Sequence, residues 1–311
     1  MTERIAKLDF IGDTHGAYGH LTRLLERLGY RRGDDWGWSH PGGRRVVFLG
    51  DYVDRGDEIR EVLETVRAMV ESGDAYAIAG NHEFNFIAWH TFRSEGSTKR
   101  CRPEHKRSQL QKSLDQLGEA AGEWVEWMRQ LPPWWACGNL RAIHACWVES
   151  EALELMELWR DAGGWSEDLV RRASDSSNRE FHLVERVMKG VELRLPPGVT
   201  ITTGAERTVR HRARIAWWSA PEEERPMGDQ LVPPLAVPTP PLGESAAAWP
   251  NPDELGDRLV FCGHYWLTDE RPRLRSPQVA CLDYSVAQGG KLCAYRHDGE
   301  RELSEQKMVW V

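Results

Sequence analysis

The feature of this sequence that most constrains its fold is a short apolar run ending in a glycine-bounded polar turn, which occurs three times. Residues 5–12, 45–49 and 75–79 read as buried strands. Residues 18–29 and 57–71 lie between them and carry apolar side chains at helical spacing. This alternation predicts an α/β fold with a mostly parallel, helix-covered sheet, in which polar residues gather at the carboxyl ends of the strands.

The rest of the chain is less regular. Residues 93–108 are rich in Arg, Lys and Ser, which predicts a surface loop. Helices are expected over 109–131 and through most of 151–195, and strands over 141–145, 259–262, 279–282 and 291–295. Residues 220–253 hold most of the prolines. We therefore expect a single domain over 1–311, with a helical and proline-rich insertion at about 150–255 that caps the site.

Composition excludes several classes of protein. The hydrophobic fraction of 41% is that of a globular chain, and no apolar run is long enough to cross a membrane. The formal net charge of −8 argues against stable nucleic-acid binding. The six cysteines form no Cys-x-x-Cys pair, and the first residues do not resemble a secretory leader. We expect a cytoplasmic protein with reduced thiols.

The polar turns contain a set of metal-binding side chains. The three motifs are Gly12-Asp13-Thr14-His15-Gly16, Gly50-Asp51-Tyr52-Val53-Asp54-Arg55-Gly56 and Gly80-Asn81-His82-Glu83. His144 and His264 follow later strands in the same way. The candidate ligands combine carboxylate, amide and imidazole groups, and they are Asp13, His15, Asp51, Asn81, His144 and His264. Six ligands exceed what one catalytic ion needs, so we expect two divalent ions, Mn²⁺ before Fe²⁺ or Zn²⁺, which share one carboxylate.

The order and spacing of these motifs resemble the calcineurin-like metallophosphoesterases, most closely the branch that contains the phosphoprotein phosphatases. The match is strong over residues 5–90 and weaker over 140–146 and 258–296. The resemblance implies a four-layer α/β/β/α sandwich of two mixed sheets. Cys146 and Tyr265 depart from the usual residues beside His144 and His264.

The resemblance also implies a role for each motif residue. Asp13 and His15 match ligands of the first metal, Asp51 matches the bridging carboxylate, and Asn81, His144 and His264 match ligands of the second metal. His82 matches the general acid, Asp54 the carboxylate that holds it, and Arg55 the arginine that grips the phosphoryl oxygens. Glu83 is interpreted as a carboxylate favoured by a helix N-terminus. Arg214 is a candidate for a second phosphate-binding arginine, but Ala220 stands where the similar enzymes have Asp.

These observations predict a metal-dependent phosphatase that hydrolyses phosphomonoesters, including phosphoserine and phosphothreonine, through a metal-bridging hydroxide. The alternatives are a symmetric dinucleoside polyphosphate hydrolase and an RNA-end phosphatase. The motifs do not separate them, because metals and arginine contact only the phosphate. The basic cluster Lys99, Arg100, Arg102, Lys106 and Arg107 keeps the RNA alternative open. A non-catalytic scaffold would be expected to lose ligands, and all six positions are intact.

Overall fold

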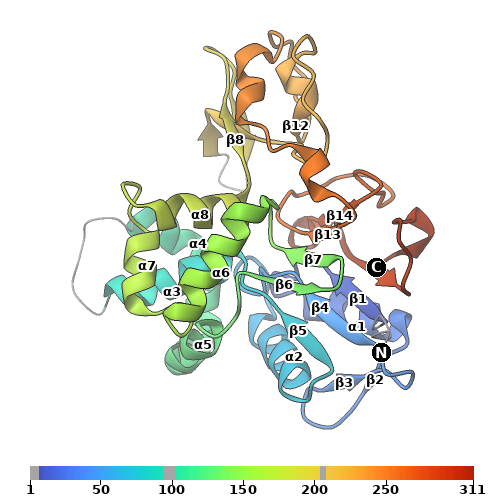
Figure 1. The fold of residues 1–311 in the computed structure, drawn as a ribbon. Helices are drawn as coiled ribbons and strands as arrows, with labels where there is room; N and C mark the ends of the chain where they lie inside the picture. The colour runs from blue at the N-terminus through green and yellow to red at the C-terminus, as the bar shows by residue number, and fades with distance from the viewer. Residues whose placement is uncertain (1–6, 94–102, 204–207) are drawn as a thin grey trace.

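The computed structural model describes residues 7–93, 103–203 and 208–311, and it confirms the α/β class (Figure 1). The largest sheet has the central order β15-β16-β1-β4-β5, with β17 also paired to β16. Its strands are β1 (Leu8–Ile11), β4 (Arg45–Phe48), β5 (Ala75–Ala77), β15 (Asp283–Tyr284), β16 (Lys291–His297) and β17 (Met308–Trp310).

The strand directions correct one expectation about this sheet. β1, β4 and β5 are parallel, as the alternation predicts. β16 is antiparallel to β1, β15 and β17, so the sheet is mixed rather than mostly parallel. The two classes of strand differ in their connections: helices link the parallel strands, whereas a short turn links β15 to β16. The helices α1 (Tyr18–Leu28) and α2 (Ile59–Glu71) pack against this sheet.

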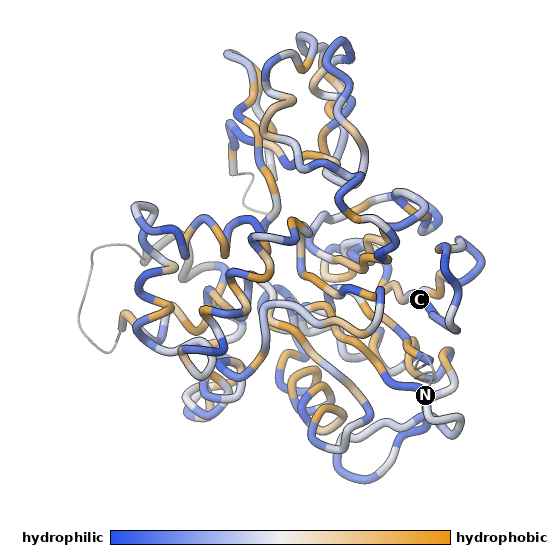
Figure 2. Tube along the Cα trace, viewed as in Figure 1, coloured by the Kyte–Doolittle hydropathy of each residue, from blue (hydrophilic) through white to orange (hydrophobic). Residues whose placement is uncertain are grey.

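A second sheet has the order β14-β13-β7-β6. Its strands are β6 (Trp134–Cys137), β7 (Leu140–Ile143), β13 (Leu259–Cys262) and β14 (Val279–Cys281). Phe10 of β1 stacks on Phe261 of β13 with ring centroids 3.6 Å apart, so the two sheets meet through their side chains. Figure 2 shows apolar residues along the strands and on the helix faces turned toward them.

The remaining helices lie on the side of the parallel strands opposite α1 (Figure 1). They are α3 (Asn81–Arg93), α4 (Pro103–Leu117), α5 (Ala121–Met128), α6 (Glu149–Asp161), α7 (Glu167–Ala173) and α8 (Arg179–Lys189). Part of the predicted loop is therefore helical, because α4 begins at Pro103. The helix expected over 109–131 is divided at Gly118, where φ is +50°. No helix in the described ranges is long and apolar enough to cross a bilayer.

Residues between β7 and β13 connect two neighbouring parallel strands by a long excursion. This excursion holds α6, α7 and α8 and then a three-stranded sheet of β8 (Glu192–Arg194), β11 (Arg212–Ile215) and β12 (Leu231–Val232). Further short strands and single turns of 3₁₀ helix complete the secondary structure: β2 (Arg31–Arg32), β3 (Trp38–Ser39), β9 (Ile201–Thr203), β10 (Thr208–Arg210) and turns at 118–120, 227–230, 243–248, 252–255, 286–288 and 305–307. Residues 151–195 are thus largely helical, as predicted, and they end in β8, which pairs with β11.

A buried ion pair links the central strands of the larger sheet. Asp9 of β1 is fully buried and accepts two hydrogen bonds of 2.9 Å from the Arg44 guanidinium. Arg44 also donates to the carbonyls of Leu8 and His297. Arg296, opposite Asp9 on β16, and the Tyr30 hydroxyl complete the shell of Asp9. This pairing joins β1, β4 and β16 at the amino end of β1, away from the polar turns.

Replacing Arg44 by methionine should lower the free energy of unfolding by about 3–5 kcal/mol, because it leaves the buried Asp9 charge without its bidentate partner. Urea unfolding followed by circular dichroism measures the change. Arg67→Met is the matched control, since Arg67 forms a more exposed pair with Glu71 on α2 and should cost less than about 1 kcal/mol. Equal midpoints for the two variants would show that the buried pair is not the stabilising contact.

Candidate metal centre

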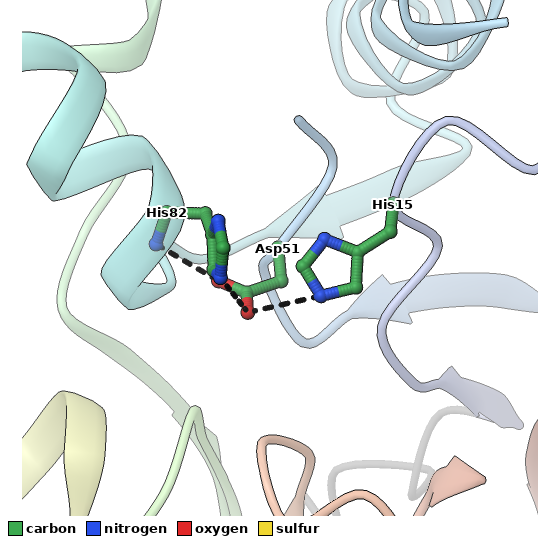
Figure 3. A group of neighbouring side chains, drawn as sticks. All are labelled: His15, Asp51 and His82. Carbon is green, nitrogen blue, oxygen red and sulfur yellow. Dashed lines mark hydrogen bonds and ion pairs between the residues drawn. The ribbon is translucent and has the colours of Figure 1, made fainter. Parts of the chain in front are cut away.

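The carboxyl ends of five strands bring most of the predicted ligands together. His15 follows β1, Asp51 follows β4, Asn81 follows β5, His144 follows β7 and His264 follows β13. Two groups of donor side chains form here, His15–Asp51–His82 and Asp51–His144–His264. Within each group the donor atoms lie within 4.8 Å of one another. Asp51 is the member that the two groups share, and the first group is drawn in Figure 3.

The Asp51 carboxylate is surrounded by imidazole nitrogens. Its Oδ2 lies 3.4 Å from His15 Nε2 and 3.8 Å from His82 Nε2, and its Oδ1 lies 3.3 Å from His144 Nε2. Oδ1 also accepts the backbone N–H of His82 at 3.0 Å (Figure 3). Both oxygens are therefore fixed and point toward different histidines.

Asn81 joins the second group through its side-chain amide. Its Oδ1 position lies 3.2 Å from His144 Nε2 and 2.7 Å from His264 Nδ1. Asp13 lies beside the two groups rather than within them. Its oxygens accept the backbone N–H of His264 at 3.1 and 3.3 Å. All six predicted ligands are thus buried at one edge of the sheets.

Backbone carbonyls set the orientation of two of the imidazoles. His15 Nδ1 lies 2.8 Å from the Val53 carbonyl, and His144 Nδ1 lies 2.7 Å from the Leu49 carbonyl. Each contact places a proton on Nδ1 and leaves a lone pair on Nε2, the form in which histidine binds a cation. Among the described residues, the buried Nε2 atoms of His15 and His264 have no hydrogen-bond partner. A divalent cation would satisfy such atoms.

The electrostatics favour neutral imidazoles at His15 and His264 and an ionised carboxylate at Asp51. Burial, together with nearby positive groups, holds the pKa values of His15 and His264 well below the usual value. Burial opposes the charge of Asp51, but His144 and His82 outweigh it and hold its pKa well below the usual value. The Asp51 carboxylate in turn outweighs burial at His144 and raises its pKa. Burial and the charges of Asp283 and Asp51 raise the pKa of Asp13.

A second arrangement of side chains adjoins the first. His82 Nδ1 lies 2.6 Å from Asp54 Oδ2, and His82 Nε2 lies 3.2 Å from Arg55 Nη2. Arg55 is part-buried, so its guanidinium reaches both the histidine and the solvent side of the site. His82 therefore contacts both of the residues with which the resemblance connects it, Asp54 and Arg55.

Helix α4 supports this arrangement through residues that sequence reasoning missed. The buried Ser113 hydroxyl donates to Asp54 Oδ1 and accepts the Asp54 backbone N–H at 2.9 Å. Gln116 donates to the Gly56 carbonyl, and Lys112 donates to the Arg55 carbonyl. No local motif marks these residues, because they lie nearly 60 positions further along the chain.

Glu83 does more than favour a helix N-terminus. Its carboxylate is fully buried and accepts the backbone N–H groups of Gly80, Asp51 and Tyr52 at 2.8 Å each, and that of Val53 at 3.3 Å. It therefore ties the loop after β4 to the loop after β5. Burial and the Asp51 charge raise the pKa of Glu83 to about 6, against the lowering effect of these N–H groups. In the sequence, only the position of Glu83 at the end of the third motif indicates that it acts at the site.

The loops at the site have unusual backbone angles. His15, Asp51, Asp54, Arg55 and His264 all have positive φ, a region that residues other than glycine rarely adopt. Gly56 is needed for close packing, because a Cβ at this position would lie 2.1 Å from the His15 carbonyl oxygen. Such strain is typical of functional sites, where the surrounding structure enforces it.

The two departures from the family pattern, Cys146 and Tyr265, leave the ligands in place. Cys146 is buried, as is Cys262 before the His264 loop. Burial raises the pKa of both thiols, so neither is a thiolate near neutral pH. Tyr265 is also buried and packs its ring against Trp218. Trp217 and Trp218 are buried as well, so this pair packs in the core.

Replacing Glu83 by glutamine should lower the phosphatase turnover that the motifs predict at least about 10-fold and the free energy of unfolding by about 1–3 kcal/mol, because an amide NH₂ would then face backbone N–H donors. Turnover and urea unfolding are measured on the same preparation. Glu123→Gln is the control, since Glu123 is exposed and, within the described ranges, pairs with Arg67 alone. Unchanged turnover in Glu83→Gln would contradict the idea that this carboxylate shapes the site.

Relatives with known names share parts of this chain. The bis(5'-nucleosyl)-tetraphosphatase PrpE (asymmetrical) of Halalkalibacterium halodurans is 44% identical over 78 residues, which cover 24% of this chain and 30% of that protein. The protein of the same name from a Geobacillus species is 33% identical over 127 residues, 37% of this chain and 50% of that protein. The chain thus matches half or less of the length of these relatives.

A solved structure and a family model cover more of the chain. The cold-active protein-tyrosine phosphatase of a psychrophilic Shewanella superposes with a TM-score of 0.51 at 17% identity, over 94% of this chain and 76% of that one, which shows a common fold. A family model described as calcineurin-like phosphoesterase matches residues 6–185, more than half of the chain. The chain belongs to the calcineurin-like phosphoesterases.

Proposed function

We propose that this protein is a phosphatase that uses two divalent cations, with phosphomonoesters as its leading substrate class. The observation that carries the proposal is the position of Asp51. This one buried carboxylate directs its two oxygens toward different groups of nitrogen donors, as a ligand shared by two ions must do.

The donor set fits such ions. The unpartnered Nε2 atoms of His15 and His264, and the neutral state of both imidazoles, suit Mn²⁺, Fe²⁺ or Zn²⁺. Asp13 and His15 would hold one ion, Asn81, His144 and His264 the other, and Asp51 both. The bound ions would supply Lewis-acid activation of the phosphoryl group and of the attacking water.

The protein's own side chains have three tasks in this proposal. The Arg55 guanidinium binds two phosphoryl oxygens and stabilises the charge that develops on them. His82 donates a proton from Nε2 to the leaving oxygen, and Asp54 accepts the hydrogen bond from Nδ1 and fixes the ring. Because Arg55 Nη2 lies 3.2 Å from His82 Nε2, the arginine must turn from the histidine to the phosphate before this proton transfer.

The relatives support a second candidate substrate. The proteins that match residues of this chain at 33–44% identity are named bis(5'-nucleosyl)-tetraphosphatases, which favours a dinucleoside polyphosphate over an RNA end. The basic cluster behind the RNA alternative lies outside the part of the chain whose side chains are described. We also propose a cytoplasmic location, because the described cysteines are free thiols. Cys101 lies outside the described residues.

Removing bound metal should abolish hydrolysis of p-nitrophenyl phosphate, and Mn²⁺ should restore it at about two equivalents per chain. Asp51→Asn should lower turnover more than about 100-fold, because both ions lose a charged ligand. Asp168→Asn is the control, since this exposed carboxylate pairs with Arg172 and with no other residue of the described part of the chain. Metal content is measured by elemental analysis beside the rate. Full activity without metal, or full activity in Asp51→Asn, would reject the two-ion proposal.

Replacing His82 by alanine should slow the hydrolysis of an alkyl phosphate by about 100-fold or more, because an alkoxide leaves poorly without a proton. An aryl phosphate, whose phenolate leaves unprotonated, should lose much less. The two values of kcat are compared in one variant, which separates the acid role from general damage. Equal losses on both substrates would contradict the assignment.

A further inference from the structure

The proposed mechanism gives no task to Trp266, although this side chain lies at the catalytic edge. It is partly buried and lies two residues after His264, on the loop that follows β13. The guanidinium carbon of Arg55 lies 4.0 Å from the centroid of its ring, and that of Arg214 lies 5.5 Å from it. An aromatic face attracts a cation within about 6 Å. One neutral ring therefore contacts two cationic side chains beside the metal centre.

The backbone of Trp266 is fixed from two sides. Its N–H donates to Asp283 Oδ2 at 2.7 Å, and the N–H of Leu267 donates to the Asp283 carbonyl at 2.9 Å. Before it in the loop, the N–H of His264 donates to the carboxylate of Asp13. The φ of Trp266 is +50°, which residues other than glycine rarely adopt. Because these contacts use the backbone at position 266, another side chain can replace the indole without removing them.

Arg55 is held by contacts that leave its charge available. Its Nη2 lies 3.2 Å from His82 Nε2, and its guanidinium carbon lies over the Trp266 ring. Among the described residues, no carboxylate oxygen lies within ion-pair distance of this guanidinium, and the neighbouring Asp54 carboxylate bonds to His82 Nδ1 instead. A carboxylate would compete with a phosphoryl group for the guanidinium N–H donors. A ring contacts the flat face of the guanidinium and leaves these in-plane donors free.

The backbone of Arg55 does not by itself place the guanidinium. The Arg55 carbonyl accepts a hydrogen bond from Lys112, and its φ is +70°. Both features fix the main chain, whereas a long arginine side chain keeps several rotatable bonds. A contact with the Trp266 ring removes part of this freedom before a substrate binds, which lowers the entropy lost on binding.

We propose that Trp266 is a positioning residue for Arg55. Its indole holds the guanidinium beside the metal centre without neutralising it, while the N–H donors turn from His82 to a phosphoryl group. The role depends on the negative face of an aromatic ring, so another aromatic side chain replaces the indole better than an aliphatic one of similar bulk. The inference rests on the proposed function, because Arg55 is assigned there to the phosphoryl oxygens.

Competitive inhibition by orthophosphate measures how tightly the site holds a phosphoryl group. Orthophosphate competes against p-nitrophenyl phosphate at a fixed free Mn²⁺ concentration. Trp266→Leu should weaken orthophosphate binding about 5- to 30-fold, the range that corresponds to losing a partly desolvated cation–π contact. Trp266→Phe should lose less than about 3-fold, because it keeps an aromatic face. Unchanged affinity in Trp266→Leu, or equal losses in both variants, would overturn the proposal.

A double-mutant cycle shows whether Trp266 acts through Arg55. Arg55→Ala should weaken orthophosphate binding, and adding Trp266→Leu should cause less than about 2-fold further loss, because no guanidinium remains to be positioned. A full further loss would assign the indole to another contact, such as that with Arg214, and would overturn the proposal. Metal content is measured for each variant. A Trp266→Leu protein that no longer binds Mn²⁺ would also overturn it, since the indole would then support the metal loop.

Trp36→Leu is the matched control. Trp36 is also partly buried, has a φ of +67° and has the Arg32 guanidinium 5.8 Å from its ring centroid, but it lies in the turn between β2 and β3. This variant should keep the wild-type affinity for orthophosphate. A loss equal to that of Trp266→Leu would show a general effect of removing an indole and would contradict a specific role for Trp266.

The failure of the proposed function has a different signature. A wild-type protein that binds Mn²⁺ but does not hydrolyse p-nitrophenyl phosphate would reject the phosphomonoesterase proposal alone, and calorimetry of orthophosphate with the Mn²⁺-loaded protein then gives the same comparison of variants. An Arg55→Ala protein with unchanged orthophosphate affinity would remove Arg55 from the phosphate site. That result would reject both the task given to Arg55 and the positioning role of Trp266, as would a Mn²⁺-loaded wild type that binds no orthophosphate.

Discussion

The arrangement of the rest of the site depends on the buried charge of Asp51. A carboxylate removed from water is stable only when nearby groups compensate it. Here the His82 backbone N–H donates to Oδ1 of Asp51, and the charges of His144 and His82 lower the pKa of the carboxyl group. These residues come from loops after different strands, so the charge is compensated only when the two sheets are correctly assembled. The same geometry leaves imidazole lone pairs directed inward, which is the preorganisation that a two-cation site requires.

A second buried carboxylate controls the backbone rather than the ligands. Glu83 binds four N–H groups of two loops, although its negative charge lies near that of Asp51. These N–H groups offset part of the cost of burying the Glu83 charge. The hydrogen bond from the Asp51 N–H to Glu83 also holds Asp51 in its left-handed conformation. Helix α4 acts similarly on the neighbouring turn through Ser113, which fixes Asp54 and so orients His82. Both contacts explain how strained turns keep a single geometry.

The long excursion between β7 and β13 brings its own residues to this centre. Because these two strands are parallel neighbours, the excursion begins at the carboxyl end of β7, at the catalytic edge, and returns to the amino end of β13, where Leu259 lies opposite Leu140. Within the excursion, β11 places Arg214 against the carbonyl of His264, and Trp266 contacts both this arginine and Arg55.

Local patterns in the sequence determined the strands that precede each motif, the helices between them and the positions of the metal-binding side chains, because glycine turns and apolar periodicity act over a few residues. The tertiary structure alone decided which strands are antiparallel, where Ser113 and Glu83 direct their hydrogen bonds, and that β8 rather than a helix follows residue 191. Arg214 and His264, 50 positions apart, carry no local sign of their contact. Pairing across such distances depends on the packing of the whole chain, which no short pattern encodes.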